Sequence, residues 1–219
     1  MVPCSSLALF APTPTDLPSS LFEVSNQKAF WSGPTHLVLG ADAHSAAFLA
    51  CSADVRVVSA HAAPTVGNGA ALMLADGPWT PFAATRGSFS GAVFILNCCA
   101  TSEQGHRGSG PDETFSLPIA FIPAGASAVI CTRWSVADEV AACFGLRLVE
   151  LLNTGGDLSE VVVEGRRFLR ESSADEIVEW LEDCHPIESQ DVRSLMAEFG
   201  GSDLPFRDAR HWAAFSLWL

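Results

Sequence analysis

Short, continuously apolar runs alternate with helical stretches along the chain, and this alternation constrains the fold more than any other sequence feature. The runs are rich in β-branched and aromatic residues, which is typical of strands buried on both faces. The predicted strands cover residues 5–11, 36–40, 55–62, 92–99 and 126–134. Helical stretches between successive strands produce parallel pairing through crossover connections. We therefore expect an α/β fold with a mostly parallel β-sheet and helices on both faces.

The remaining segments fit the same scheme. Helices are predicted over residues 16–31, 43–51, 113–124, 135–152, 158–171, 174–184 and 190–199. Residues 70–75 form a possible short strand, residues 79–86 a helical turn, and the closing segment 211–219 an edge strand. A chain of 219 residues is long enough for one well-buried core. We expect a single domain over residues 1–219.

The charge balance argues against several classes of partner. The formal net charge is −13 and the isoelectric point is about 4.7, so the chain would repel phosphate backbones and anionic membrane surfaces. We therefore expect no nucleic-acid partner and no membrane partner. The first residues lack the positive region of a signal peptide, and no stretch is apolar enough to span a membrane. We expect a soluble protein.

The cysteine and histidine spacings do not suggest a metal site. Seven cysteines form an odd set without a CxxC motif, and six histidines show no HxxxH spacing. The sequence also lacks a glycine-rich phosphate loop, so we expect no metal and no cofactor. Free thiols in a chain of this size are typical of a reducing compartment, which predicts a cytoplasmic location.

Two residues at predicted strand ends suggest a reaction. His61 ends the predicted strand 55–62, and Cys99 ends the predicted strand 92–99. Neighbouring strands lie about 4.8 Å apart, so an imidazole at one strand end can take the proton of a thiol at the next and leave a nucleophilic thiolate. Backbone N–H groups of Ala62 and Cys99 could then stabilise an oxyanion. The alternative is structural, because a strand cysteine commonly belongs to the core.

A polar, glycine-rich loop over residues 101–112 directly follows Cys99, and loops at this edge of a sheet build sites. Asp112 and Glu113 at the end of this loop favour a basic substrate residue. Arg133 and Trp134 share the same carboxyl edge at the end of the fifth predicted strand. We interpret them as residues that line a substrate cleft or contact its rim.

Four segments of the sequence resemble the CHAT domain, a caspase-related family of cysteine peptidases. They are VVSAHA at 57–62, LNCCATS at 96–102, ETFSLPIAFIPAGASAVICTRWSVADEV at 113–140, and the final HWAAFSLWL. The resemblance covers nearly the whole chain and implies a caspase-like fold with His61 as the base and Cys99 as the nucleophile. It further implies an endopeptidase that acts on a protein substrate through an acyl-enzyme and awaits a trigger or an activating protein partner.

The chain also departs from the family pattern at three places. Ala62 follows the histidine where the family has glycine, and Ala100-Thr101-Ser102 follows the cysteine where the family has Glu-Thr-Gly. These changes motivate an alternative, a catalytically degenerate CHAT domain that acts as a protein-interaction module. The stretch 172–208 is longer than the usual family link, so we interpret it as a helical insertion, either a packed lobe or a lid and docking surface.

A small-molecule hydrolase would need a G-x-S-x-G elbow, which the sequence lacks.

Overall fold

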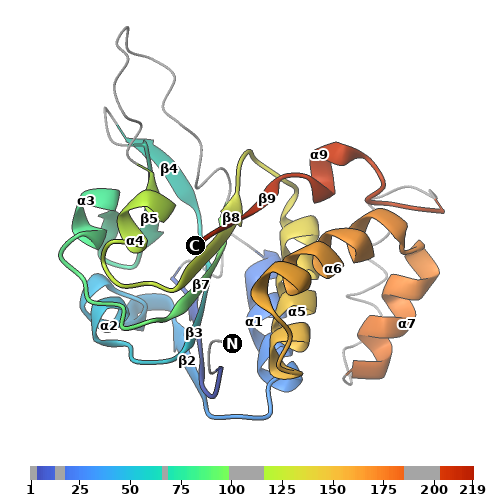
Figure 1. The fold of residues 1–219 in the computed structure, drawn as a ribbon, viewed down its shortest axis with the longest axis horizontal. Helices are drawn as coiled ribbons and strands as arrows, with labels where there is room; N and C mark the ends of the chain where they lie inside the picture. The colour runs from blue at the N-terminus through green and yellow to red at the C-terminus, as the bar shows by residue number, and fades with distance from the viewer. Residues whose placement is uncertain (1–3, 13–17, 66–68, 99–115, 185–202) are drawn as a thin grey trace, which may run out of the picture.

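A twisted sheet of six strands forms the middle layer of the described part of the chain (Figure 1). The structure is a computed structural model, and it describes residues 4–12, 18–65, 69–98, 116–184 and 203–219. In spatial order the strands are β2 (Thr35–Leu39), β1 (Leu7–Ala11), β3 (Val55–Ser59), β7 (Val93–Asn97), β8 (Ala128–Thr132) and β9 (Phe215–Trp218). All neighbours pair in parallel except β9, which runs antiparallel to β8 at the edge.

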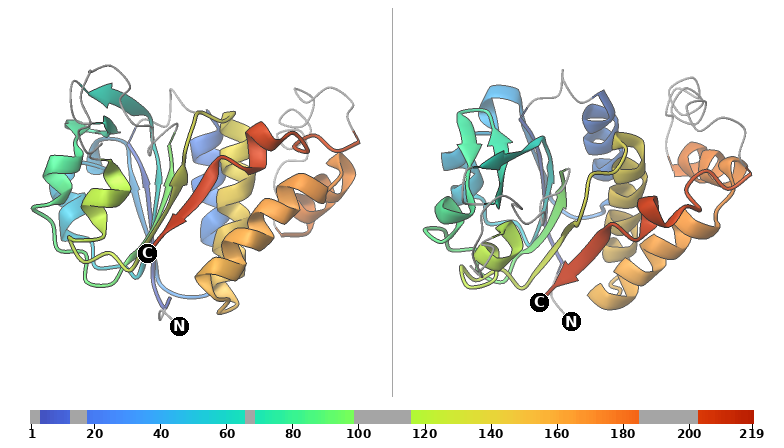
Figure 2. Two further views of the ribbon diagram at one scale, coloured as in Figure 1. Left: turned by 45° about the horizontal axis from the view of Figure 1, so that its top comes forward. Right: turned by 90° about the horizontal axis from the view of Figure 1, so that it is seen from above.

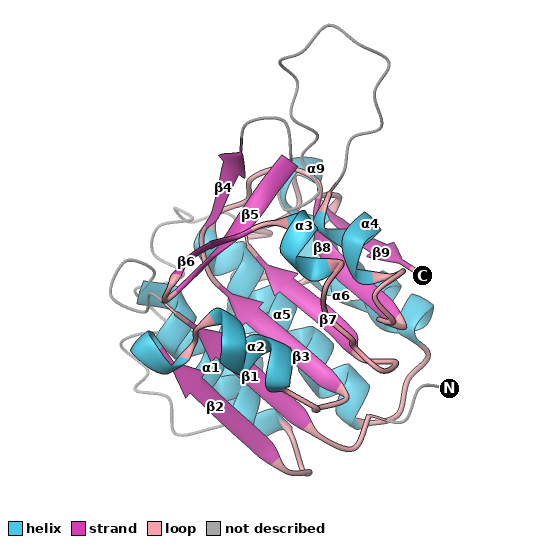
Figure 3. Cartoon of the chain, turned by 90° about the vertical axis from the view of Figure 1, so that its left-hand side faces the viewer, coloured by secondary structure: helices cyan, strands magenta, loops and turns pink. Residues whose placement is uncertain are grey.

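Helices cover both faces of this sheet, as Figure 2 shows. On one face lie α1 (Pro18–Phe30), α5 (Asp138–Asn153), α6 (Leu158–Glu171), α7 (Ala174–Cys184) and the short α9 (Ala209–Trp212). The other face carries the 3-10 turn η1 (Gly40–Asp42), α2 (Ser45–Ala50), α3 (Pro81–Ala84) and α4 (Leu117–Phe121), together with an antiparallel sheet of β4 (Ala62–Thr65), β5 (Gly69–Leu74) and β6 (Gly77–Trp79). Figure 3 looks onto this second face, with α1, α5 and α6 behind the sheet. The predicted fold class is confirmed.

The continuous apolarity of the strands follows from burial on both sides. Side chains alternate between the faces of a strand, so each strand supplies two separate cores. In β7, Val93 and Ile95 join the apolar cluster beneath α1, α5 and α6, whereas Phe94 and Leu96 join the cluster beneath α2, α3 and α4. All five residues of β1, β3, β7 and β8 are buried. None of the helices within the described ranges is long and apolar enough to cross a membrane.

Several element boundaries differ from the sequence prediction. The predicted strand 55–62 is two strands, because β3 ends at Ser59 and β4 begins at Ala62 in the second sheet. Within the predicted strand 211–219, the first residues form the turn of α9 and only Phe215–Trp218 pair with β8. The strand β6 was not predicted, since its Gly-Pro-Trp sequence lacks the usual strand pattern. The predicted helix 190–199 lies outside the described residues.

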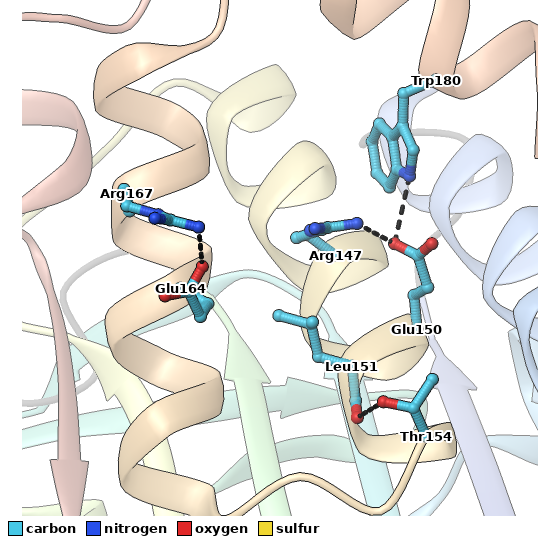
Figure 4. Close-up of polar contacts among 7 residues, drawn as sticks. All are labelled: Arg147, Glu150, Leu151, Thr154, Glu164, Arg167 and Trp180. Atoms are coloured by element: carbon cyan, nitrogen blue, oxygen red, sulfur yellow. Dashed lines mark hydrogen bonds and ion pairs between the residues drawn. The ribbon is translucent and has the colours of Figure 1, made fainter.

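Helix α7, which opens the predicted insertion 172–208, packs on the helical layer through Trp180. Its ring stacks on Phe30 of α1 at a centroid distance of 5.5 Å and meets Phe168 of α6 edge-on at 4.8 Å. Its indole N–H donates to Glu150 of α5 at 3.1 Å, and the same carboxylate oxygen pairs with Arg147 at 2.5 Å (Figure 4). A single side chain thus joins α7 to the three helices α1, α5 and α6.

Figure 4 also shows two local contacts that stabilise α5 and α6 individually. Glu164 and Arg167 form an i,i+3 ion pair at 2.5 Å on α6. At the end of α5, the Thr154 hydroxyl donates to the Leu151 carbonyl oxygen at 2.7 Å and so satisfies a carbonyl left free by the helix terminus. Both contacts are at the surface and contribute little to stability.

Trp180→Ala should lower the free energy of unfolding by roughly 2–4 kcal/mol, because it removes a large partly buried aromatic side chain from three contacts. Trp180→Phe keeps the aromatic packing and loses the indole hydrogen bond, so it should cost only about 1 kcal/mol. Urea unfolding of the two variants and the wild type checks this order. Equal stability of all three proteins would contradict the proposed anchoring of α7.

Candidate functional site

The carboxyl ends of β3, β7 and β8 lie side by side at one edge of the sheet. Ser59 is the register partner of Asn97 across β3 and β7, and Leu96 is the partner of Cys131 across β7 and β8. In a parallel sheet this edge is where ligand sites are built. The candidate residues follow directly from these strand ends, and His61 comes two residues after Ser59.

His61 is exposed and lies at the junction of the two sheets. Its carbonyl oxygen accepts a hydrogen bond from the Met73 N–H of β5 at 2.9 Å. The prediction that His61 ends a strand was therefore wrong in detail, since β3 ends two residues earlier and β4 begins one residue later. The chain turns at this point because it leaves the parallel sheet to start the antiparallel one.

The backbone of Ala62 is oriented by the same pairing. Ala62 is the register partner of Leu72. The neighbouring pair, His61 and Met73, is a hydrogen-bonded pair, because the Met73 N–H donates to the His61 carbonyl oxygen. Positions along an antiparallel ladder alternate, so Ala62 occupies a position where N–H groups point away from the partner strand. The Ala62 N–H is thus directed away from β5.

Cys98 is a core residue. It is 3% exposed, belongs to the apolar cluster beneath α2, α3 and α4, and its thiol donates to the Val58 carbonyl oxygen at 3.3 Å. Its own carbonyl oxygen accepts from the Thr132 hydroxyl at 2.7 Å, which joins the end of β7 to the end of β8. These contacts indicate that Cys98 is a structural residue and not a reactive thiol. They also fix the position of the residue that precedes Cys99 in the sequence.

Three of the predicted site residues lie outside the described residues, namely Cys99, Asp112 and Glu113. The structure brings Arg133 to the carboxyl edge directly after β8, where it is exposed and its backbone N–H donates to the Ala214 carbonyl oxygen at 2.8 Å. Trp134 is half-buried, packs on the α1–α5 side of the core and donates its indole N–H to the Arg210 carbonyl oxygen at 2.8 Å. Its ring is therefore engaged in packing the segment before β9.

A buried carboxyl group that the sequence analysis did not single out lies under the same edge. Glu23 of α1 is 3% exposed. One of its oxygens, Oε2, accepts from the Ser59 hydroxyl at 2.5 Å, and the other, Oε1, accepts from Gln27 at 2.6 Å and from the side-chain amide of Asn97. We call these four residues, Glu23, Gln27, Ser59 and Asn97, the strand-end cluster. It joins the last residues of β3 and β7 to one helix.

Gly145 in the middle of α5 makes room for this cluster. A Cβ atom at this position would lie 2.0 Å from the Asn97 amide nitrogen and 2.5 Å from Glu23 Oε1. Real Cβ atoms do not approach other atoms so closely, so glycine is required for α5 to pack over the cluster. The sequence signal was a polar residue at the end of each apolar strand and a glycine between buried apolar residues within a helix.

Burial dominates the electrostatics of the cluster. It raises the pKa of Glu23 to about 8, since removal from water disfavours the charged form, although the hydrogen bonds from Ser59, Asn97 and Gln27 act in the opposite direction. Asp138 raises the pKa of Glu23 further by charge repulsion. Burial likewise raises the pKa of the neighbouring Cys143 thiol to about 12, so that thiol stays protonated and unreactive.

The described residues offer no group of three or more His, Cys, Asp and Glu side chains that could hold a metal ion. Five free cysteines occur in the same part of the chain, namely Cys4, Cys51, Cys98, Cys131 and Cys143. Among the described residues at the strand edge, His61 supplies an imidazole, Ala62 a backbone N–H group and Arg133 a guanidinium.

Glu23 should make folding stability fall as pH rises from about 5 to about 8. Its pKa is raised in the folded state, so the folded chain holds a proton that the unfolded chain has already released in this range. At about 1.4 kcal/mol per pKa unit, the loss is on the order of 3–5 kcal/mol. Urea unfolding of the wild type and of Glu23→Gln at pH 5, 6.5 and 8 measures it.

The stability difference between wild type and Glu23→Gln isolates this one group, because all other titrating residues are shared. The difference should shift in favour of the Gln variant as pH rises. A difference that stays constant over the range would contradict a buried, protonated Glu23.

Comparison with solved structures finds a similar arrangement of sheet and helices within larger proteins. The solved structure of the Arg-specific cysteine proteinase gingipain R (RgpB) matches with a TM-score of 0.53 at 8% sequence identity, over 97% of this chain and 45% of that chain. A structure described as a protease matches with a TM-score of 0.54 at 13% identity, over 97% of this chain and 46% of the other. The complex of the Porphyromonas gingivalis RgpB pro- and mature domains gives a TM-score of 0.49 at 8% identity, with 97% and 46% covered.

The chain spans less than half the length of these structures, and at such identities the likeness establishes the fold alone. That fold is the caspase-like α/β arrangement predicted from the sequence. No curated protein matches the sequence. The CHAT domain family matches residues 13–218, which is nearly the whole chain. This chain belongs to the CHAT domain family.

Proposed function

We propose that the chain is a cysteine endopeptidase that cleaves a protein substrate with Cys99 as nucleophile and His61 as base. The observation that supports this most directly is the register of β3 and β7. Ser59 pairs with Asn97, an offset of 38 residues, and the same offset separates His61 from Cys99 in the sequence. His61 and Cys99 therefore each come two positions in sequence after a matched pair of strand ends.

Covalent geometry limits how far Cys99 can be from this edge. Cys98 is held by hydrogen bonds to β3 and β8, and consecutive Cα atoms lie about 3.8 Å apart. Neighbouring strands are about 4.8 Å apart, which supports the proposal because an imidazole after one strand can then come within reach of a thiol after the next. The burial of Cys98 also leaves Cys99 as the thiol of this pair that can face a substrate.

The proposed reaction has two stages. His61 takes the thiol proton, and the Cys99 thiolate attacks the scissile carbonyl carbon; His61 then gives the proton to the leaving amine, and a thioester acyl-enzyme remains. Water, deprotonated by His61, attacks the thioester and releases the carboxylic acid product and the free thiol. The outward-directed N–H of Ala62, with that of Cys99, is the proposed donor pair for the tetrahedral oxyanion.

A basic P1 residue is the proposed preference. Asp112 and Glu113 follow the nucleophile, and the net charge of −13 favours basic peptides. Gingipain R, whose structure has a similar fold, is described as Arg-specific. That specificity is a property of gingipain R. Arg133 and Trp134 complete the proposed cleft wall, with Trp134 acting mainly through packing.

Three further parts of the proposal concern the whole protein. The chain acts as one domain over residues 1–219, with α7 as the fixed beginning of the insertion 172–208. An activating protein partner releases its activity. Its free thiols suit the reducing conditions of the cytoplasm.

The second candidate function is a degenerate interaction module with the same fold. The observation that favours it is Ala62 after the histidine and Ala100 after the cysteine, where the family carries glycine and glutamate. An alanine has less backbone freedom than glycine close to a substrate. Thiol reactivity separates the two functions.

The wild-type protein should form a single covalent adduct with a peptide acyloxymethylketone that carries Arg or Lys at P1, as measured by intact mass. Cys99→Ala should form no adduct, and His61→Ala should react at least about 100-fold more slowly, since general base catalysis contributes that much. Cys98→Ala is the matched control and should react like the wild type, because the Cys98 thiol is buried.

Warheads with acidic and apolar P1 residues complete the panel. An adduct that persists in Cys99→Ala would refute the assigned nucleophile. A wild-type protein that reacts with no warhead, alone or with candidate partner proteins, would favour the interaction module.

A further inference from the structure

One carboxyl group contacts both strand ends from which the proposed catalytic residues follow. Glu23 accepts from Ser59 at the end of β3 and from Asn97 at the end of β7. Each of these residues stands two positions before a member of the proposed pair. We propose that Glu23 is a positioning residue for the peptidase reaction, because its carboxyl group holds the two strand ends in a fixed relation. The inference rests on the function proposed above.

The geometry suits this role. Glu23 projects from α1, which packs along α5 against the sheet. Gln27, one turn later on α1, donates at 2.6 Å to Glu23 Oε1, the oxygen that also accepts from Asn97. The carboxyl group is therefore fixed from its own helix as well as from both strands. One residue separates Ser59 from His61 and Asn97 from Cys99, so a shift of either strand end is passed on through a very short stretch of backbone. Displacements of about 1 Å can cost about 100-fold in rate.

Packing alone does not account for the cluster. Four polar side chains occupy a site where apolar residues of similar volume would fill the same space without a desolvation cost. Their presence also requires Gly145 inside α5, although glycine weakens a helix relative to alanine. The desolvation of the polar groups and the glycine in α5 both destabilise the fold. In return, the cluster provides a directional link between β3 and β7, which apolar contacts do not supply.

The link works with the carboxyl group protonated. A neutral carboxylic acid can donate its O–H to Ser59 while Oε1 still accepts from Asn97 and Gln27. Asp138 of α5 is the charged group that acts on Glu23, and Glu23 in turn acts on the Cys143 thiol, whereas the hydrogen-bond partners of Glu23 on α1, β3 and β7 do not titrate. Glutamine has the same shape and charge as the neutral acid, so it can make each of these hydrogen bonds.

Three variants test the proposal through the rate of Cys99 adduct formation with the peptide warhead. Glu23→Gln should react within about 3-fold of wild type at pH 7. Glu23→Leu keeps the volume but removes the links, and it should react at least about 10-fold more slowly. Gly145→Ala pushes on the cluster from α5 and should also slow the reaction while every reacting group is retained.

Circular dichroism and urea unfolding show whether each variant is folded. A folded Glu23→Leu that reacts at the wild-type rate would overturn the proposal. If Glu23→Leu does not fold, Gly145→Ala decides, and a folded Gly145→Ala that reacts at the wild-type rate would then overturn the proposal.

The outcome is separable from that of the proposed function. A wild type without a Cys99 adduct refutes the peptidase and with it the positioning role. An adduct on wild-type Cys99 whose rate is the same in all three folded variants leaves the peptidase standing and refutes the role of Glu23 alone.

Discussion

The parallel pairing of β3 with β7 is the constraint on which the rest of the molecule depends. Both strands are buried on both faces, so their register is set by two cores at once, and a slip of one residue would exchange the apolar clusters. The register makes Ser59 and Asn97 partners. This register determines which residues follow the two strands at the same point of the carboxyl edge. The proposed site has one residue after each strand, so it depends on the register.

Polar groups reinforce the apolar pairing where the strands end. The Cys98 thiol contacts the Val58 carbonyl, the Thr132 hydroxyl contacts the Cys98 carbonyl, and Glu23 joins Ser59 to Asn97. Hydrogen bonds fix direction as well as distance, which apolar packing does not. Three neighbouring strand ends are thus linked where the chain has to change direction.

The sequence analysis predicted the layers of the fold and the two neighbouring strands that precede His61 and Cys99 in the chain. It misplaced the end of β3, because Ala60, Ala62 and Ala63 are small and apolar and continue the strand pattern through a change of sheet. It overlooked Glu23, since one acidic residue within a helix resembles any solvated surface residue. The family resemblance gave the expected roles of His61 and Cys99, since their spacing alone would have favoured a structural cysteine.

The sequence by itself determined the fold class, because apolar runs of strand length separated by helices leave a parallel, doubly covered sheet as the consistent arrangement. Tertiary structure alone decided which polar residues share the buried space under the strand edge. Glu23, Ser59, Asn97 and Gly145 are far apart along the chain, and no local pattern relates them. Their meeting depends on the register of β3 with β7 and on the close packing of α1 and α5, which are properties of the assembled core.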